Sequence, residues 1–304
     1  MAPTTRAQSR RSGRGKVDVP AFSNPEAEHR FRAAYDAVLS RWPRDRQQRR
    51  LSTGFGITVV QVCGVESGLP VLLLHGGGST AASWFANVGA LAGSCRIYAP
   101  DRPGEAGLSE SGPTELQERD DWMSWIGAVL DRLGVTRCAV VGHSFGGWLA
   151  LSYAVHAPHR VSHLALLDPT SCFRGGRTGY NLRAIPLFLR PTASRLRSFL
   201  HWETGGRSVD PTYLGLLAEA TEGVRTARTV LPRRPTEQAL HELDVPTLLV
   251  LPADSRQNDP VKTAADARER MADVTVVELS GHTHHTIPTE SAEELNRILL
   301  DFLL

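Results

Sequence analysis

This 304-residue chain has no long apolar run, contains little lysine, and carries nearly equal numbers of positive and negative charges. The longest apolar run, residues 69–74, is the length of a strand and far below the roughly 18 residues of a membrane-spanning helix. With 34 basic and 32 acidic residues, the net charge of +2 provides no broad basic field for nucleic acid. Only Lys16 and Lys262 are lysine, a skew typical of a GC-rich genome. The composition therefore predicts a globular protein without nucleic-acid or membrane partners.

Cysteine is also sparse, and Cys63, Cys95, Cys138 and Cys172 are widely separated. Their spacing suits neither a zinc site nor a dense disulfide framework. Residues 1–20 contain five basic side chains and almost no apolar ones, and the apolar stretch of a secretory signal does not follow. We therefore expect a disordered basic tail and a cytoplasmic location.

Buried strands and amphipathic helices alternate along most of the chain. Strands that are apolar on both faces and separated by helices indicate an α/β fold with a mostly parallel sheet flanked by helices. Residues 41–50 look like a charged link. The expected strands are 56–63, 71–74, 96–99, 139–141, 164–167, 247–251 and 274–277, and the expected helices are 25–40, 122–133, 145–156, 260–271 and 295–303.

The alternation breaks between residues 169 and 243, where several arginines and glycines accompany two helix-like pieces. We interpret 169–243 as an inserted helical cap, and residues 21–168 with 244–304 as the core. Ligands bind at the carboxyl edge of open α/β sheets, so the cap is expected to cover that edge and shape the substrate pocket.

The pentapeptide Gly142-His143-Ser144-Phe145-Gly146 lies between a buried strand and an apolar helix. This setting is typical of a nucleophile elbow, a strained turn that exposes a serine hydroxyl at the end of a strand. Small residues are needed because the chain passes close to its neighbours there. Ser144 is therefore the candidate nucleophile.

Candidate donors for an oxyanion follow an earlier strand, in the run His75-Gly76-Gly77-Gly78. An acyl-transfer intermediate carries a negative oxygen, which backbone N–H groups stabilise. We expect one donor from Phe145, directly after the nucleophile, and one from Gly77 or its neighbour Gly78.

The candidate base is His282, which follows the last strand in Ser280-Gly281-His282. A serine hydroxyl needs a base to accept its proton, and histidine titrates in the right range. His284 and His285 lie close by, but no carboxylate or cysteine joins them at the spacing of metal ligands. We therefore expect neither a metal nor a cofactor.

Taken together, residues from about 52 to 304 resemble the α/β-hydrolase family with a serine nucleophile. The shared motifs occur in the family's order, and Ser144 argues against epoxide hydrolases and haloalkane dehalogenases, which use aspartate at the elbow. The resemblance implies an esterase, lipase or thioesterase. The motifs are the glycine run 75–78, Asp101-Arg102-Pro103-Gly104 with Gly107 and Ser109, the elbow 142–147, and Gly281-His282.

The acid of the expected triad stays open between two main candidates. Most of the family carries it after the strand that follows the cap, where this chain has Ser255, with Asp254 one residue early. Asp168 ends the strand after the nucleophile's strand, and some family members carry their acid there. Asp259 already has an explanation as a helix N-cap.

These features predict a serine hydrolase that cleaves an ester or related acyl bond of a small molecule through an acyl-enzyme. The alternatives are a non-catalytic ligand-binding protein that retains the fold, an acyltransferase, and a haloperoxidase-like enzyme. Neither the substrate nor the oligomeric state can be inferred from these residues.

Overall fold

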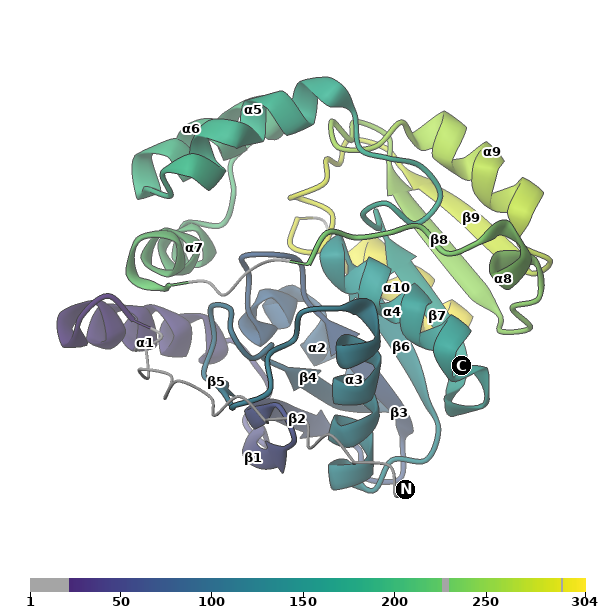
Figure 1. The fold of residues 1–304 in the computed structure, drawn as a ribbon, viewed down its shortest axis with the longest axis horizontal. Coiled ribbons are helices and arrows are strands. Elements are labelled where there is room, and N and C mark those ends of the chain that lie inside the picture. The colour runs from purple at the N-terminus through teal and green to yellow at the C-terminus, as the bar shows by residue number, and fades with distance from the viewer. Residues whose placement is uncertain (1–21, 226–229, 291) are drawn as a thin grey trace, which may run out of the picture.

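The computed structural model describes residues 22–225, 230–290 and 292–304, and a single sheet forms its centre (Figure 1). Among these residues, nine strands pair in the order β1-β2-β4-β3-β6-β7-β8-β9, with β5 also on β2. The six strands from β4 to β9 along this order are parallel, whereas β2 runs antiparallel to β1, β4 and β5. The strands are β1 Gln47–Thr53, β2 Gly56–Gly64, β3 Leu69–Leu74, β4 Cys95–Pro100, β5 Glu110–Ser111, β6 Cys138–His143, β7 Val161–Leu167, β8 Thr247–Pro252 and β9 Val274–Leu279.

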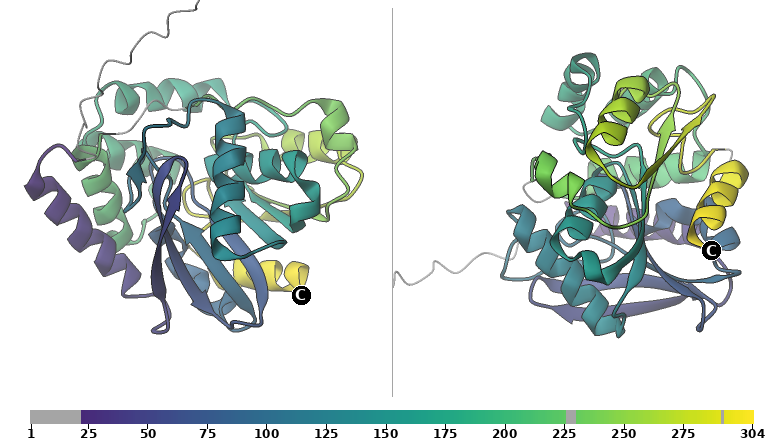
Figure 2. Two further views of the ribbon diagram at one scale, coloured as in Figure 1. Left: turned by 60° about the horizontal axis from the view of Figure 1, so that its bottom comes forward. Right: turned by 90° about the vertical axis from the view of Figure 1, so that its right-hand side faces the viewer.

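Helices cover both faces of the sheet (Figure 2), as expected for strands that are apolar on both sides. One cluster of buried apolar side chains joins the sheet to α1, α2, α5, α6, α7 and α10, and a second joins it to α3, α4, α8 and α9. The α/β fold with a mostly parallel sheet is confirmed. The helices are α1 Pro25–Leu39, α2 Val88–Leu91, α3 Arg119–Leu133, α4 Phe145–His156, α5 Thr178–Leu189, α6 Ala193–Glu203, α7 Pro211–Gly223, α8 Glu237–His241, α9 Pro260–Arg270 and α10 Ala292–Leu303, with short 3-10 turns at Ala81–Ala86 and Pro158–Arg160.

Helix ends follow the capping residues in the sequence. The Asn24 side chain accepts a hydrogen bond from the Ala27 N–H at the start of α1, and Asp259 does the same for Lys262 in α9. Gly134 ends α3 in the left-handed conformation, with φ of 72°, which glycine adopts without a steric penalty.

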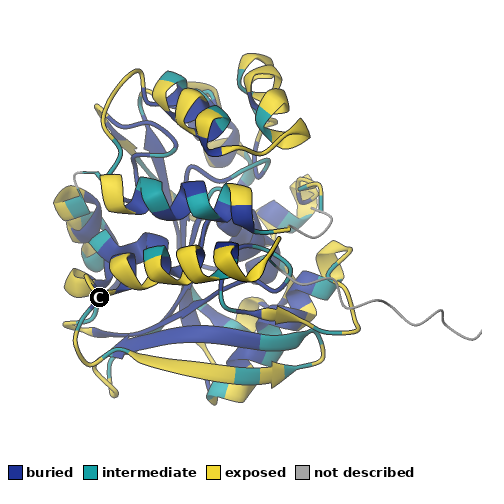
Figure 3. Cartoon of the chain, turned by 90° about the vertical axis from the view of Figure 1, so that its left-hand side faces the viewer, coloured by how far each residue is buried: buried dark blue, intermediate teal, exposed yellow. Residues whose placement is uncertain are grey.

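One element was predicted wrongly. The charged stretch 41–50 contains the beginning of β1, which pairs antiparallel with β2 along its length. Its first four residues, from Gln47 to Arg50, are exposed, so nothing in their side chains indicates burial. Figure 3 shows this exposed strand along the edge of the sheet beside the buried β2. Charged side chains are usual on an edge strand, where they discourage pairing with other chains.

The expected cap range, 169–243, contains helices α5 to α8 between β7 and β8. Helices α5, α6 and α7 lie together, and α7 packs beside α1, which comes from the other end of the expected core (Figure 1). Helix α8 instead packs beside α9. We therefore use the name cap for α5–α7, and the division into core and cap stays a prediction.

Three further expectations from the sequence concern the N-terminal tail, the cysteines and membrane-spanning helices. The expected tail, residues 1–20, lies outside the described residues. All four cysteines are buried and have free thiols. In the part of the chain that the structure describes, every helix is too short or too polar to cross a membrane.

Candidate active site

Ser144 occupies the sharp turn between β6 and α4, with φ of 57° and ψ of −120°. A non-glycine residue at positive φ is strained, and such strain is commonly held at functional sites. The flanking glycines make the turn possible. A Cβ on Gly142 would lie 2.2 Å from the Gly146 carbonyl oxygen, and one on Gly146 would lie 2.0 Å from that of Leu74. Larger residues are therefore excluded at both positions.

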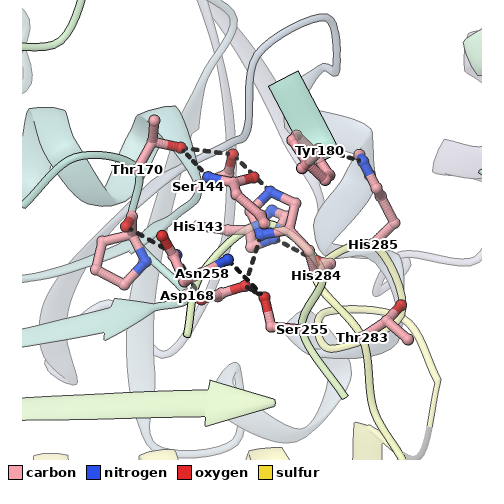
Figure 4. A network of polar contacts seen from close by, with 12 residues as sticks. His143, Ser144, Asp168, Thr170, Tyr180, Ser255, Asn258, Thr283, His284 and His285 are labelled. Carbon is pink, nitrogen blue, oxygen red and sulfur yellow. Dashed lines mark hydrogen bonds and ion pairs between the residues drawn. The ribbon is translucent and has the colours of Figure 1, made fainter. Parts of the chain in front are cut away.

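A chain of hydrogen bonds joins Ser144 to a histidine and a carboxylate (Figure 4). The Oγ of Ser144 lies 2.9 Å from Nε2 of His284, and Nδ1 of His284 lies 2.8 Å from Oδ2 of Asp168. His284 and Asp168 are almost completely buried. A serine hydroxyl, an imidazole and a buried carboxylate in this order form the arrangement that activates a serine as a nucleophile.

The histidine that bonds to Ser144 and Asp168 is His284, not His282 as we expected from the sequence. His282 is buried, and its Nδ1 has no hydrogen-bond partner among the described residues. Its backbone carbonyl accepts a hydrogen bond from the Asp254 N–H. After β9, which ends at Leu279, the chain continues through residues 280–282. A turn that begins at Thr283, closed by the Ile287 N–H on the Thr283 carbonyl, then brings His284 to the serine. The sequence contained the signal, a group of three histidines, but the position closest to the end of the last strand favoured His282 instead of His284.

Of the candidate acids, the structure brings only Asp168 to the histidine. Its two oxygens also accept hydrogen bonds from Ser255 Oγ and Asn258 Nδ2, both at 2.7 Å. Burial alone raises the pKa of Asp168, but the hydrogen bond and charge of His284, with those of Asn258 and Ser255, outweigh it and lower the pKa below its ordinary value. Asp168 is thus held as a carboxylate.

Asp254 and Asp259 lie elsewhere. Asp254 is half exposed and forms an ion pair of 2.6 Å with Arg207, and Asp259 caps α9. Ser255 occupies the position at which the resemblance to the family led us to expect the acid. Here the Ser255 hydroxyl instead donates a hydrogen bond to the carboxylate of the acid, Asp168. Sequence reasoning missed Ser255 and Asn258 as partners of the acid, although both lie in the loop between the end of β8 and the start of α9.

The cap contributes a buried carboxylate to the histidine loop. Glu203, at the end of α6, accepts hydrogen bonds from the backbone N–H groups of His284 and His285, at 3.1 and 3.4 Å, and from the Thr283 hydroxyl at 2.9 Å. Burial raises the pKa of Glu203. From α5, the Tyr180 hydroxyl lies 3.2 Å from Nε2 of His285. Two cap helices therefore hold the loop that carries His284.

His143, within the elbow, holds the same loop from the opposite side. Its Nε2–H donates to the His284 carbonyl oxygen at 2.8 Å, and the two rings lie 4.9 Å apart. Burial, followed by the nearby charge of His284, lowers the pKa of His143 to about 3. The His143 ring is consequently neutral near neutral pH, with its proton on Nε2.

The expected oxyanion donors lie next to each other. A Cβ on Gly77 would meet the Phe145 Cβ at 3.8 Å, and Phe145 begins α4, where the first N–H groups of a helix have no partner within it. The buried Arg102 donates to the carbonyls of His75 and Gly76, at 2.7 and 2.9 Å, and its guanidinium lies 4.8 Å from the centre of the Phe145 ring. Arg102 thus contacts both segments that supply the expected donors. The oxyanion role of Gly77 and Phe145 stays a prediction.

The three histidines of the loop have different hydrogen-bond partners. His284 contacts the serine and the acid, and His285 contacts Tyr180 and lies edge-on to the His284 ring, with the two centroids 5.0 Å apart. The Nδ1 atom of His282 has no hydrogen-bond partner among the described residues. Within the described ranges, no group of three or more His, Cys, Asp or Glu residues is arranged as metal ligands.

Comparison with known proteins agrees with this arrangement. The model of the alpha/beta hydrolase family matches residues 71–298. Over 299 residues the chain is 28% identical to carboxylesterase YbfK of Bacillus subtilis, covering 94% of this chain and 97% of the relative. An uncharacterized carboxylesterase, nap, of the same organism is 26% identical, with 90% and 92% covered.

A solved structure gives the same fold. The naproxen esterase (carboxylesterase NP) from Bacillus subtilis superposes with a TM-score of 0.86 at 24% identity, covering 93% of this chain and 100% of that one. The chain belongs to the alpha/beta hydrolase family. The prediction of an enzyme of the carboxylic ester hydrolase type is confirmed at the level of this family and these relatives.

Proposed function

We propose that this protein is a serine hydrolase that cleaves carboxylic esters of small molecules through an acyl-enzyme. The observation that carries the proposal is the continuous hydrogen-bonded chain from Ser144 through His284 to Asp168, at 2.9 and 2.8 Å. The carboxylesterase relatives, which match nearly the whole chain, support the ester as substrate class.

In the acylation half-reaction, Ser144 Oγ attacks the ester carbonyl carbon while Nε2 of His284 takes the hydroxyl proton. Asp168 accepts the Nδ1–H bond and stabilises the imidazolium that forms. The N–H groups of Phe145 and Gly77 are the proposed donors to the oxyanion. The C–O bond to the alcohol then breaks, and the leaving oxygen takes the proton from Nε2.

In the deacylation half-reaction, water replaces the alcohol. Its oxygen attacks the acyl carbon while His284 takes one of its protons. The bond from the acyl carbon to Ser144 Oγ breaks, and Oγ recovers its proton from Nε2. The carboxylic acid leaves, and these steps need no metal or cofactor. A cytoplasmic location is likewise a proposal.

The proposal is tested with a panel of acyl esters of varied chain length and charge, assayed with the wild type and Ser144→Ala. We expect turnover of at least one ester by the wild type and loss of that turnover in the variant. Hydrolysis that persists within tenfold of wild type in Ser144→Ala would overturn the serine mechanism.

A further inference from the structure

The hydrogen-bond directions in the site follow from the groups present. The pKa of Asp168 is lowered, so its carboxylate accepts and Nδ1 of His284 carries a proton. In a neutral imidazole the other nitrogen, Nε2, is then an acceptor. The Ser144 hydroxyl therefore donates its single proton to Nε2, and any further partner of Ser144 Oγ must be a donor.

That further partner is Thr170. Its Oγ1 lies 3.2 Å from Ser144 Oγ (Figure 4), so the Thr170 hydroxyl is the donor in this contact. Gln257 Nε2 donates to Thr170 Oγ1 at 2.7 Å, which agrees with this direction, because the Thr170 proton is directed away from Gln257. The Thr170 N–H also donates to the Ser144 carbonyl at 3.0 Å. The threonine is thus fixed at the elbow by its backbone and by the buried Gln257.

We propose that Thr170 is a catalytic residue whose hydroxyl donates to Ser144 Oγ and acts chiefly in deacylation. This inference rests on the proposed function and extends it to the step in which the acyl-enzyme is resolved. In that step the bond between the acyl carbon and Oγ breaks, and Oγ receives the bonding electrons. A donor at Oγ stabilises this developing negative charge, and the proton that completes the serine hydroxyl still comes from Nε2 of His284.

The two half-reactions respond differently because their starting states differ. Before acylation, Oγ is a hydroxyl oxygen that already accepts the Thr170 hydrogen bond, so part of the stabilisation is present in the ground state. In the acyl-enzyme, Oγ is the alkoxy oxygen of an ester and a poor acceptor. The hydrogen bond therefore strengthens more on the way to the transition state of deacylation than to that of acylation.

The test is pre-steady-state kinetics with 4-nitrophenyl acetate on the wild type, Thr170→Val and Thr170→Ser. Release of nitrophenol in single turnovers reports acylation, and mass spectrometry of quenched, steady-state samples reports the acylated fraction. In Thr170→Val we expect deacylation to slow by about tenfold to a hundredfold and acylation by less. The acylated fraction should rise accordingly. Thr170→Ser, which keeps the hydroxyl, should return both quantities towards wild type.

Thr221→Val is the matched control, since the Thr221 hydroxyl donates to the Leu217 carbonyl within its own helix, α7. We expect both of its rates to match the wild type. Equal slowing of both half-reactions in Thr170→Val, or an unchanged rate of deacylation, would overturn the inference. An inert wild type would instead contradict the proposed function, so the two failures are distinguishable. Melting temperatures show whether Thr170→Val is folded. If it is not, Gln257→Ala provides a second test, and we expect it to slow deacylation more than acylation, by a smaller factor than Thr170→Val.

Discussion

Ser144 and Asp168 lie at the ends of parallel strands, whereas His284 lies in a loop that is held from outside the sheet. Ser144 directly follows β6 and Asp168 directly follows β7, and both residues have positive φ values. The loop is bound by Glu203 and by His143, the former from the cap. The fold itself therefore supplies the nucleophile and acid, and packing between the sheet and the cap supplies the base.

The cap also differs from the sheet on its outer surface. Leu182, Ile185, Phe188 and Leu189 of α5 are exposed, with Phe188 at 80%, while the strands of the sheet centre are buried. Tyr180 of the same helix reaches the histidine loop. Substitutions in the cap should consequently tune the site, and substitutions at the strand ends should abolish its activity.

The largest effect is expected from His284→Ala, which removes the base between Ser144 and Asp168. Ester hydrolysis should fall by about 10⁴- to 10⁶-fold, as for other triad members. His282→Ala is the matched control, because His282 comes from the same loop and has no contact with the serine, and its kcat should stay within about threefold of wild type. The reverse result would restore our original assignment of His282.

Asp168→Asn should cost about 10⁴-fold in kcat, since an amide favours the wrong tautomer of the histidine. Asp254→Asn and Asp259→Asn should retain wild-type turnover, because one is a surface ion pair and asparagine caps a helix about as well as aspartate. Parallel measurements of kcat on one ester check this. Normal turnover in Asp168→Asn would mean that the histidine needs no carboxylate.

A smaller effect is expected in the cap. Glu203→Gln keeps the shape of the side chain but loses the second acceptor oxygen that the loop's N–H and hydroxyl donors need. We expect about 2 kcal/mol lower stability and about a tenfold lower kcat. Glu219→Gln is the control, since Glu219 pairs with Arg30 near the surface. Denaturant melts and kcat values compare the two. An unaltered Glu203→Gln variant would show that the cap does not hold the loop.

The last prediction concerns the pH dependence of stability that His143 contributes. Its pKa in the folded protein, about 3, lies below the ordinary value of about 6.5, so the unfolded chain binds this proton first. The associated stability is fully present above pH 6.5 and is lost as the pH falls towards 3. Between pH 6.5 and 5 this group should cost about 2 kcal/mol. His143→Gln, which can still donate to the His284 carbonyl, should lose correspondingly less stability in urea melts over this range. An equal loss in both proteins would refute the assignment.

The sequence predicted the sheet and the strand-borne residues because their signals are local. An apolar run stops at Gly142, and a strand stops at Asp168, so both positions follow from the elements that precede them. The path of a loop depends on partners distant in the chain. Glu203 is about eighty residues from the loop that it holds, which is why spacing favoured His282 over His284. The edge strand β1 was missed for a related reason, because its pairing comes from backbone contacts with β2 that exposed charged side chains do not reveal.

The most direct measurement of the central claim is the site and rate of labelling by a fluorophosphonate probe, mapped by peptide mass spectrometry. The probe reacts with a serine only when a base activates it. We predict a single adduct on Ser144 in the wild type and in His282→Ala, formed at similar rates, and labelling at least a thousandfold slower in His284→Ala. Rapid labelling of Ser144 in His284→Ala, or an adduct on another residue, would contradict the account.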